Sequence, residues 1–164
     1  VQLNEGAAYA RSALLYFVHA DVLPPTTYLS DLQHAIEAGK QWGFFSYRFK
    51  KPHTLLKINA YYTRFDGLFA GGGDQTLFIL KSAFDELGGF DESYRIMEDF
   101  EFTKRAKAAR LPFKIIKNDV KVSARKYTSN SYLRVNLVNL WMFILFWQGA
   151  PQEKMIRIYQ RWLK

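Results

Sequence analysis

The stretch "YFVHADVLPP", residues 16–25, is an apolar run that passes into a His-x-Asp sequence and stops at two prolines. Upstream lies "NEGAAYARSA", residues 4–13, which is rich in small, helix-compatible residues. A helix followed by a short, aromatic, buried strand is typical of an α/β layer fold. The chain is therefore expected to be α/β, with this strand in its sheet.

Composition indicates one globular unit with a basic C-terminal half. The 164 residues, 49% apolar and 17% aromatic, suffice for one hydrophobic core and are too few for two ordinary domains. The absence of cysteine excludes disulfides, zinc–thiolate sites and thiol nucleophiles. Of the formal net charge of +8, most lies in residues 81–164, with 16 Lys and Arg against 9 Asp and Glu. Nucleic acid, anionic lipid or a phosphorylated small molecule would suit this surplus, and scattered solvated lysines explain it equally well.

Hydrophobic periodicity predicts the remaining elements. Helices are expected over residues 27–39, 55–65, 81–87, 96–111 and 132–147, with another after Pro151. Strands are expected over residues 42–49, 76–80, 113–117 and 120–127. The helix over residues 55–65 places these apolar side chains on one face: Leu55, Ile58, Tyr61, Tyr62 and Phe65.

The His-x-Asp sequence suggests a metal site. Residues two apart on an extended strand point the same way, so His19 and Asp21 would address one point beyond the strand's carboxyl end, where ligands bind in open α/β sheets. An imidazole and a carboxylate can hold a divalent cation, and the nitrogen favours Mn²⁺ over Mg²⁺. An ordinary loop histidine is the competing explanation.

Further carboxylates stand where a ligand could reach them. Asp74 follows three glycines, which allow close approach of the backbone, and Asp99 begins a helix, where it can face a cleft as a general base. An ordinary loop and helix capping explain the two equally well. The helix dipole lowers the pKa of a carboxylate at this position, whereas the neighbouring Glu98 and Glu101 act in the opposite direction.

Five motifs in order carry a resemblance to a known family. They are "NEGA" (4–7), "YFVHAD" (16–21), "GDQ" (73–75), "ELGGF" (86–90) and "MED" (97–99), and "VSARKY" (122–127) with the following apolar helix adds to them. In these motifs the chain resembles the family 2 glycosyltransferases of GT-A fold, in a bacterial subgroup that carries His-Ala-Asp in place of Asp-x-Asp. The resemblance implies a Rossmann-like nucleotide-diphospho-sugar transferase sheet flanked by helices, with apolar helices at the C-terminus.

The resemblance also implies a function. The enzyme would be a metal-dependent inverting glycosyltransferase that moves a sugar from a nucleotide-sugar donor, foremost a UDP-sugar, to the hydroxyl of a saccharide or lipid-linked acceptor. Asp21, helped by His19, would hold Mn²⁺ or Mg²⁺ on the donor diphosphate, and Asp99 would be the catalytic base. The substrate-binding residues would be Gly72, Gly73, Asp74, Gln75, Glu98, Arg125 and Lys126, of which the last two are explained equally well as solvated charges.

The family pattern further implies a nucleotide-binding portion ahead of residue 1, so the chain is expected to be N-terminally truncated. Residues 1–128 would be the C-terminal part of the catalytic domain, and residues 129–164 a helical extension packed on it or at a membrane surface. The expected location is the cytoplasm, or the cytoplasmic face of the membrane as a peripheral protein.

The segment over residues 132–147 leaves two alternatives open. It is apolar nearly all round, but it is shorter than the ~20 residues that span a bilayer. It would be a buried or homodimer-forming helix, or it would lie on a membrane surface. Basic residues that would attract anionic lipid are Arg134, Lys154, Arg157, Arg161 and Lys164.

The alternative to an enzyme is a non-catalytic basic binding or membrane-docking module with a transferase-like fold. Nucleic acid is not the expected partner, because the aromatic residues lie in apolar runs and are not interleaved with basic ones.

Overall fold

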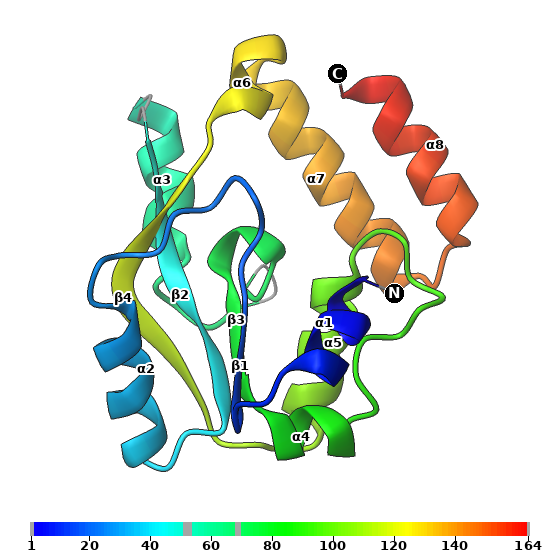
Figure 1. Cartoon of the computed structure of the whole chain (residues 1–164). Coiled ribbons are helices and arrows are strands. Elements are labelled where there is room, and N and C mark those ends of the chain that lie inside the picture. The colour runs from blue at the N-terminus through cyan, green and yellow to red at the C-terminus, as the bar shows by residue number, and fades with distance from the viewer. Residues whose placement is uncertain (1, 51–53, 68–69, 164) are drawn as a thin grey trace.

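The computed structural model describes residues 2–50, 54–67 and 70–163, which form a four-stranded mixed sheet flanked by helices (Figure 1). The strands are β1 (Leu14–Phe17), β2 (Trp42–Phe49), β3 (Leu77–Leu80) and β4 (Phe113–Val122), in the spatial order β1-β3-β2-β4. β3 is antiparallel to both of its neighbours, and β2 is parallel to β4. The carboxyl ends of β1, β2 and β4 therefore lie at one edge of the sheet, and the expected α/β class is confirmed.

The helices in the described residues largely follow the predicted pattern. They are α1 (Gln2–Tyr9), α2 (Tyr28–Glu37), α3 (Thr54–Tyr62), α4 (Lys81–Glu86), α5 (Glu98–Ala108), α6 (Arg125–Ser129), α7 (Tyr132–Trp147) and α8 (Gln152–Trp162), with a 3₁₀ helix η1 (Gly73–Gln75). The helix predicted over residues 132–147 is confirmed residue for residue as α7. The short α6 was not predicted, since residues 125–127 were assigned to a strand.

β2 divides the core into two layers, one on each face of the sheet. Phe44 packs with Phe102 of α5 and with Ile79 on one face, whereas Phe45 packs with Leu32 of α2 and with Val120 on the other. Both faces of this central strand are covered by helices, so β2 is buried almost throughout and shows no apolar–polar alternation.

β4 is one continuous strand, and the prediction of two strands in this region was wrong. The polar pair Asn118-Asp119 was read as a break, but Asp119 is satisfied inside the fold. Its carboxylate accepts hydrogen bonds from the Ser46 hydroxyl at 2.6 Å and from the Arg64 guanidinium at 2.7 and 2.8 Å. A shift in the register between β2 and β4, opposite residues 45–47 of β2, accommodates the additional residues of β4.

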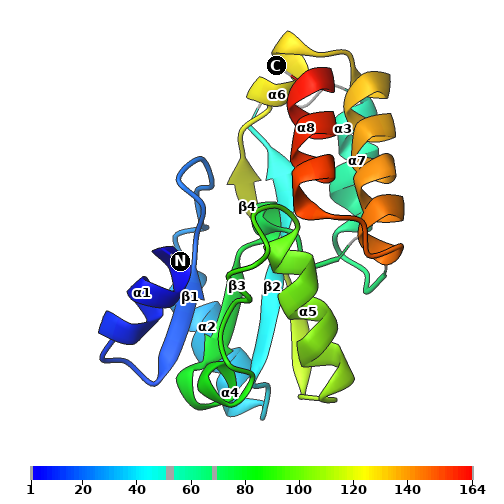
Figure 2. The same cartoon turned by 90° about the vertical axis from the view of Figure 1, so that its right-hand side faces the viewer.

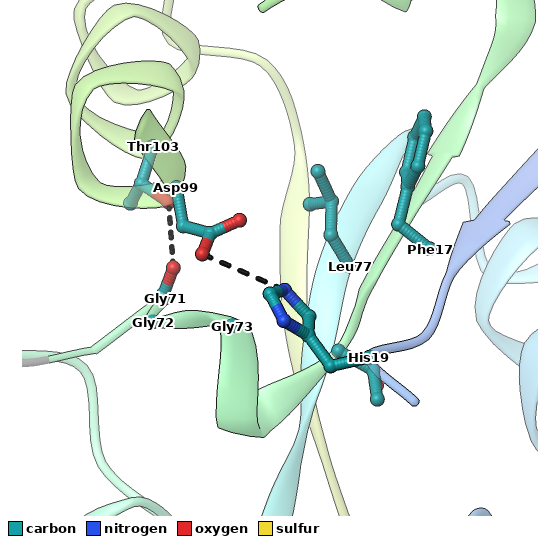
Figure 3. Close-up of a pocket in the computed structure, with 9 residues that line it drawn as sticks. Phe17, His19, Gly71, Gly72, Gly73, Leu77, Asp99 and Thr103 are labelled. Atoms are coloured by element: carbon teal, nitrogen blue, oxygen red, sulfur yellow. Dashed lines mark hydrogen bonds and ion pairs between the residues drawn. The ribbon is translucent and has the colours of Figure 1, made fainter. Parts of the chain in front are cut away.

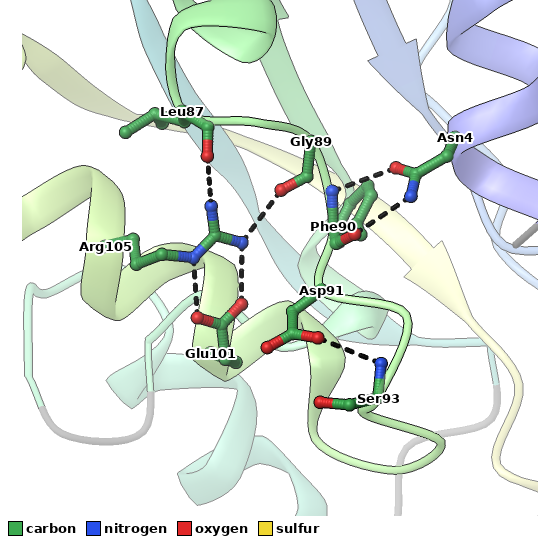
Figure 4. A network of polar contacts seen from close by, with 8 residues as sticks. All are labelled: Asn4, Leu87, Gly89, Phe90, Asp91, Ser93, Glu101 and Arg105. Atoms are coloured by element: carbon green, nitrogen blue, oxygen red, sulfur yellow. Dashed lines mark hydrogen bonds and ion pairs between the residues drawn. The ribbon is translucent and has the colours of Figure 1, made fainter.

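Arg105 fixes α5 to the loop that follows α4 (Figure 4). Its guanidinium pairs with Glu101 at 2.6 and 2.7 Å and donates to the carbonyls of Leu87 and Gly89 at 2.6 and 2.8 Å. Asn4 of α1 exchanges two hydrogen bonds with the backbone of Phe90 in the same loop, both at 2.9 Å. The first turn of α5, which carries Asp99 and Glu101, is therefore tied through Arg105 to this loop, and the loop is tied to α1.

The two C-terminal helices form a small apolar cluster of their own. Val135, Val138 and Met142 of α7 pack against Met155 of α8. Ile96, Met97 and Tyr127 pack against this cluster and join it to the rest of the protein. None of the helices within the described ranges has the length and apolar character that crossing a bilayer requires.

Candidate functional site

The turn after β1 places His19 and Asp21 at the carboxyl edge of the sheet. β1 ends at Phe17, Ala20 and Asp21 lie in a turn, and the Val22 N–H donates to the His19 carbonyl at 3.0 Å. The premise that His19 and Asp21 share one face of an extended strand is therefore wrong. The His19 ring points instead toward α5, while Asp21 is exposed (Figure 3).

Gln75 holds the loop in front of β3. Its amide oxygen accepts from the Gly71 N–H at 2.8 Å, and its amide nitrogen donates to the carbonyls of Phe45 and Thr63 at 3.3 and 3.1 Å. Gln75 is only 2% exposed. The structure therefore shows that this amide shapes the glycine loop and is turned away from solvent.

The glycine loop allows the groups around it to come very close. A Cβ at Gly73 would overlap the His19 ring and would lie 2.7 Å from Oδ2 of Asp99. A Cβ at Gly72 would lie 2.8 Å from the ring of Phe100. A side chain at either position would therefore have to displace these groups, for steric reasons that do not depend on the backbone freedom of glycine.

His19 and Asp99 form the centre of the site. Nε2 of His19 lies 3.7 Å from Oδ2 of Asp99, whose side chain is only 16% exposed (Figure 3). The pKa of Asp99 is raised to about 7: burial is the largest cause and the charges of Glu98 and Asp74 add to the rise, while His19 and a hydrogen bond from the Gly73 backbone oppose it. A carboxylate with a pKa near neutrality is suited to accept a proton at physiological pH.

The structure shows which of the opposing effects on the pKa of Asp99 is larger. Glu101 is neutralised by its bidentate pair with Arg105, so of the two glutamates only Glu98 adds to the rise in the pKa of Asp99. Burial is the largest cause of that rise, and it outweighs the stabilisation that a helix N-terminus gives to an anion.

Asp74 lies on the open side of this centre. Its side chain keeps access to solvent, so the protein atoms around it desolvate it only in part. This desolvation raises the pKa of Asp74, and the charge of Asp21 raises it further, whereas Lys126 and His19 lower it. Asp21, Asp74, Glu98 and Asp99 therefore gather at one edge of the sheet with more negative than positive charge among them.

Lys126 reaches the site and Arg125 does not. Nζ of Lys126 donates to Asn139 at 3.2 Å, lies 4.8 Å from the centroid of the Tyr159 ring, and is close enough to Asp74 to lower its pKa. Arg125 is exposed on α6, and the contacts described for the cluster do not include its side chain.

Two tyrosines near Asp74 were missed by the sequence analysis. Burial raises the pKa of Tyr47 and of Tyr127, and the charge of Asp74 contributes to both shifts. Their hydroxyls therefore stay protonated near an acidic group, and that of Tyr127 is hydrogen-bonded to Asn59. The sequence placed both tyrosines in strands and contained no signal that they would converge on Asp74.

Strained backbone borders the site on both sides. Thr76 has φ 59° and ψ 155°, a region that glycine alone adopts readily, and Met97 is left-handed at φ 65°. Each such conformation costs about 1–3 kcal/mol, and such residues concentrate at functional sites. Neither residue was identified from the sequence, because threonine and methionine carry no signal for a positive φ.

Within residues 2–50, 54–67 and 70–163, no three His, Asp or Glu side chains are grouped so that they could hold a metal ion. A cation at this edge would therefore take at most two ligands from the described chain. Comparison with protein-family models finds no matching family, and comparison with curated proteins finds no matching sequence.

Proposed function

We propose that the chain is the catalytic part of a metal-dependent inverting glycosyltransferase, which transfers a sugar from a nucleotide-diphosphate sugar to an acceptor hydroxyl. The observation that carries the proposal is Asp99, a largely buried carboxylate with a pKa of about 7 that lies beside His19 and the glycine loop. The sequence resemblance to family 2 glycosyltransferases supports the same reaction and the GT-A version of the α/β fold.

In the proposed reaction Asp99 removes the proton from the acceptor hydroxyl as its oxygen attacks the anomeric carbon. The new bond joins this oxygen to the anomeric carbon, and the bond from that carbon to the diphosphate oxygen breaks on the opposite face. The donor leaves as a nucleoside diphosphate, the proton stays on Asp99, and the configuration is inverted. Asp74 and Lys126 would bind the sugar or the acceptor.

The acidic character of the site fits a divalent cation. The pKa values of Asp74 and Asp99 are both raised, chiefly by burial and secondly by a neighbouring carboxylate, which is Asp21 for Asp74 and Glu98 for Asp99. Asp21 and His19 would hold Mn²⁺ or Mg²⁺, with water and the donor diphosphate as further ligands. The cation would neutralise the charge that develops on the departing diphosphate.

Nucleotide binding should depend on the cation and on Asp21. We expect UDP, GDP or dTDP together with Mn²⁺ to raise the melting temperature by roughly 5–10 °C at about 100 times the dissociation constant. Asp21→Ala should abolish this shift, whereas Asp85→Ala, which removes an exposed carboxylate of α4, should leave it intact. An equal shift without metal, or a full shift in Asp21→Ala, would contradict the proposal.

Gly73→Ala should damage catalysis more than folding. The new methyl group would push the His19 ring and the Asp99 carboxylate away from the loop, and a displacement of about 1 Å at a reacting group costs roughly a hundredfold in rate. The measurement is nucleoside diphosphate release at a temperature where circular dichroism shows the variant to be folded. Gly67→Ala is the matched control, because a Cβ there meets nothing within 4 Å; equal rates for the two variants would refute a role for this close approach.

A further inference from the structure

α3 and α7 both lie on the side of the molecule away from α1 and β1 (Figure 2), and the start of α7 contacts the middle of α3. Nδ2 of Asn59 donates to Oδ1 of Asn136 at 2.9 Å, and the Tyr132 hydroxyl donates to Oδ1 of Asn59 at 2.8 Å. Asn59 in the middle of α3 is therefore hydrogen-bonded to the first two turns of α7.

Both helices expose large apolar side chains, and we call this surface the α3–α7 face. Its members are each at least 39% exposed. They are Leu55, Ile58, Tyr61 and Tyr62 on α3 and Leu133, Leu137, Leu140, Trp141, Ile144 and Trp147 on α7. The apolar face predicted for the helix over residues 55–65 therefore exists, but it is exposed at the surface. The residue that α3 buries is Leu56. A surface of this kind marks an interaction site.

Helical geometry places each apolar row next to the asparagine that joins the two helices. Residues three or four apart lie on the same side of a helix, so Asn59 lies beside Leu55 and Tyr62. In the same way, Asn136 lies beside Leu133 and Leu140. The two rows therefore come nearest to each other at the Asn59–Asn136 hydrogen bond, with the α3 row on one side of it and the α7 row on the other.

Positive charge borders this surface on both outer sides. By rotation of about 100° per residue, Lys57 lies at the border of the α3 row away from α7, and Arg134 at the border of the α7 row away from α3. Lys57 also lines a groove of about 660 Å³ together with Arg48, Lys50 and Lys121. Neither α3 nor α7 contains an acidic residue.

We propose that the α3–α7 face docks on an anionic lipid surface. The apolar side chains would enter the boundary between headgroups and acyl chains, while Lys57 and Arg134 would remain at the lipid phosphates. Tryptophan and tyrosine, which make up part of the face, are favoured at this depth of a bilayer. The proposal is independent of the glycosyltransferase reaction, because none of these residues belongs to the proposed active site.

A second copy of the chain fits this face less well. In a two-fold dimer the same surface meets itself, so the cations at its border would face one another with no acidic residue of α3 or α7 between them. Residues 125–164 hold seven basic residues and one acidic residue. An anionic bilayer supplies the negative charge that a second copy lacks. Lys164, one of the cations expected to contribute, lies outside the described residues.

The test is sedimentation of the chain with vesicles of phosphatidylcholine alone or of phosphatidylcholine mixed with phosphatidylglycerol. We expect binding at least about tenfold tighter to the anionic vesicles, from two or more basic residues at the surface, and weaker binding as salt is added. Lys57→Glu and Arg134→Glu should each weaken the anionic binding by about fivefold or more. Equal binding to both vesicles, or no binding to either, would overturn the proposal.

A matched pair of variants tests the face itself. Leu137→Glu places a charge in its centre and should abolish vesicle binding, whereas Leu29→Glu on α2 should not, although Leu29 is as exposed (66% against 64%). A dimer in sedimentation velocity that Leu137→Glu dissolves, without vesicle binding by the wild type, would show that the face is covered by a second copy. The metal-dependent nucleotide shift is measured on the same proteins, so failure of docking and failure of the proposed reaction are distinguishable.

Discussion

Replacing Asp99 by asparagine should stop sugar transfer and at the same time stabilise the folded protein. A general base contributes roughly a hundredfold to ten-thousandfold to the rate, and an amide cannot accept the proton. The stabilisation arises because burial raises the pKa of Asp99 from 3.8 to about 7, so folding disfavours its charged form. At neutral to alkaline pH the variant should gain up to about 4 kcal/mol in the free energy of unfolding.

The pH dependence of stability follows from the direction of this shift. Below about pH 4 the Asp99 carboxyl is protonated in both the folded and the unfolded chain, and its favourable contribution is fully present. Between about pH 4 and 7 the unfolded chain releases this proton while the folded protein retains it, so stability falls as pH rises through this window. Above about pH 7 the carboxyl is ionised in both states and the contribution is lost.

Urea unfolding of the wild type and of Asp99→Asn across this pH range measures the effect, alongside nucleoside diphosphate release in the presence of an acceptor. Glu98→Gln provides a second check. It removes a charge that raises the pKa of Asp99, so the loss of stability should move to lower pH. Identical pH profiles for the wild type and Asp99→Asn, or retained transfer by Asp99→Asn, would show that Asp99 is not the base.

Gly43→Ala should prevent the protein from folding. Gly43 lies in the middle of the sheet, where it pairs with Phe78 of β3 and with Lys114 of β4. A Cβ at this position would overlap the Lys114 carbonyl and would lie 2.9 Å from the Phe78 ring. The central strand has neighbours on both sides and cannot move away, so we expect a loss of about 4 kcal/mol or more.

Gly6→Ala is the control for this substitution. Gly6 lies in α1, a Cβ there meets nothing within 4 Å, and alanine favours helix over glycine by roughly 0.5–1 kcal/mol. Thermal unfolding by circular dichroism should therefore show a cooperative transition at an unchanged or higher temperature for Gly6→Ala and none for Gly43→Ala. A folded Gly43→Ala protein would mean that β2 and β4 can separate locally.

Much of the fold could be predicted because local pattern and packing agree. The apolar run over residues 132–147 stands between an N-capping serine and a turn, and Ser131 does cap α7 by accepting from the Arg134 N–H. The paired glycines after α4 both take a positive φ, as a helix end requires.

What could not be predicted depends on contacts between distant parts of the chain. Asn118 and Asp119 have the composition of a turn, and only Ser46 and Arg64, far away in sequence, make Asp119 acceptable inside a strand. In the same way, the helical spacing of apolar residues cannot show whether the apolar face of α3 packs on the core or is exposed to solvent.

The same is true of the candidate site: its residue types could be predicted from the sequence, but the contacts between them could not. Its residue types stood out in the sequence, since carboxylates, glycines and a histidine follow or precede apolar strands. Their contacts did not, because β1 ends at Phe17, the chain turns at Ala20 and Asp21, and the His19 ring lies beside Asp99. The near-neutral pKa of Asp99 depends mainly on burial, a property that its sequence neighbours do not reveal.

The positive φ angles of Thr76 and Met97 have a consequence for evolutionary drift. Glycine adopts such angles without the cost that a side chain incurs, so selection for folding alone would favour glycine at both positions. Trp42, by contrast, is fully buried and needed for folding in any descendant. Lineages that no longer use this site are therefore expected to change at residues 76 and 97 long before they change in the core.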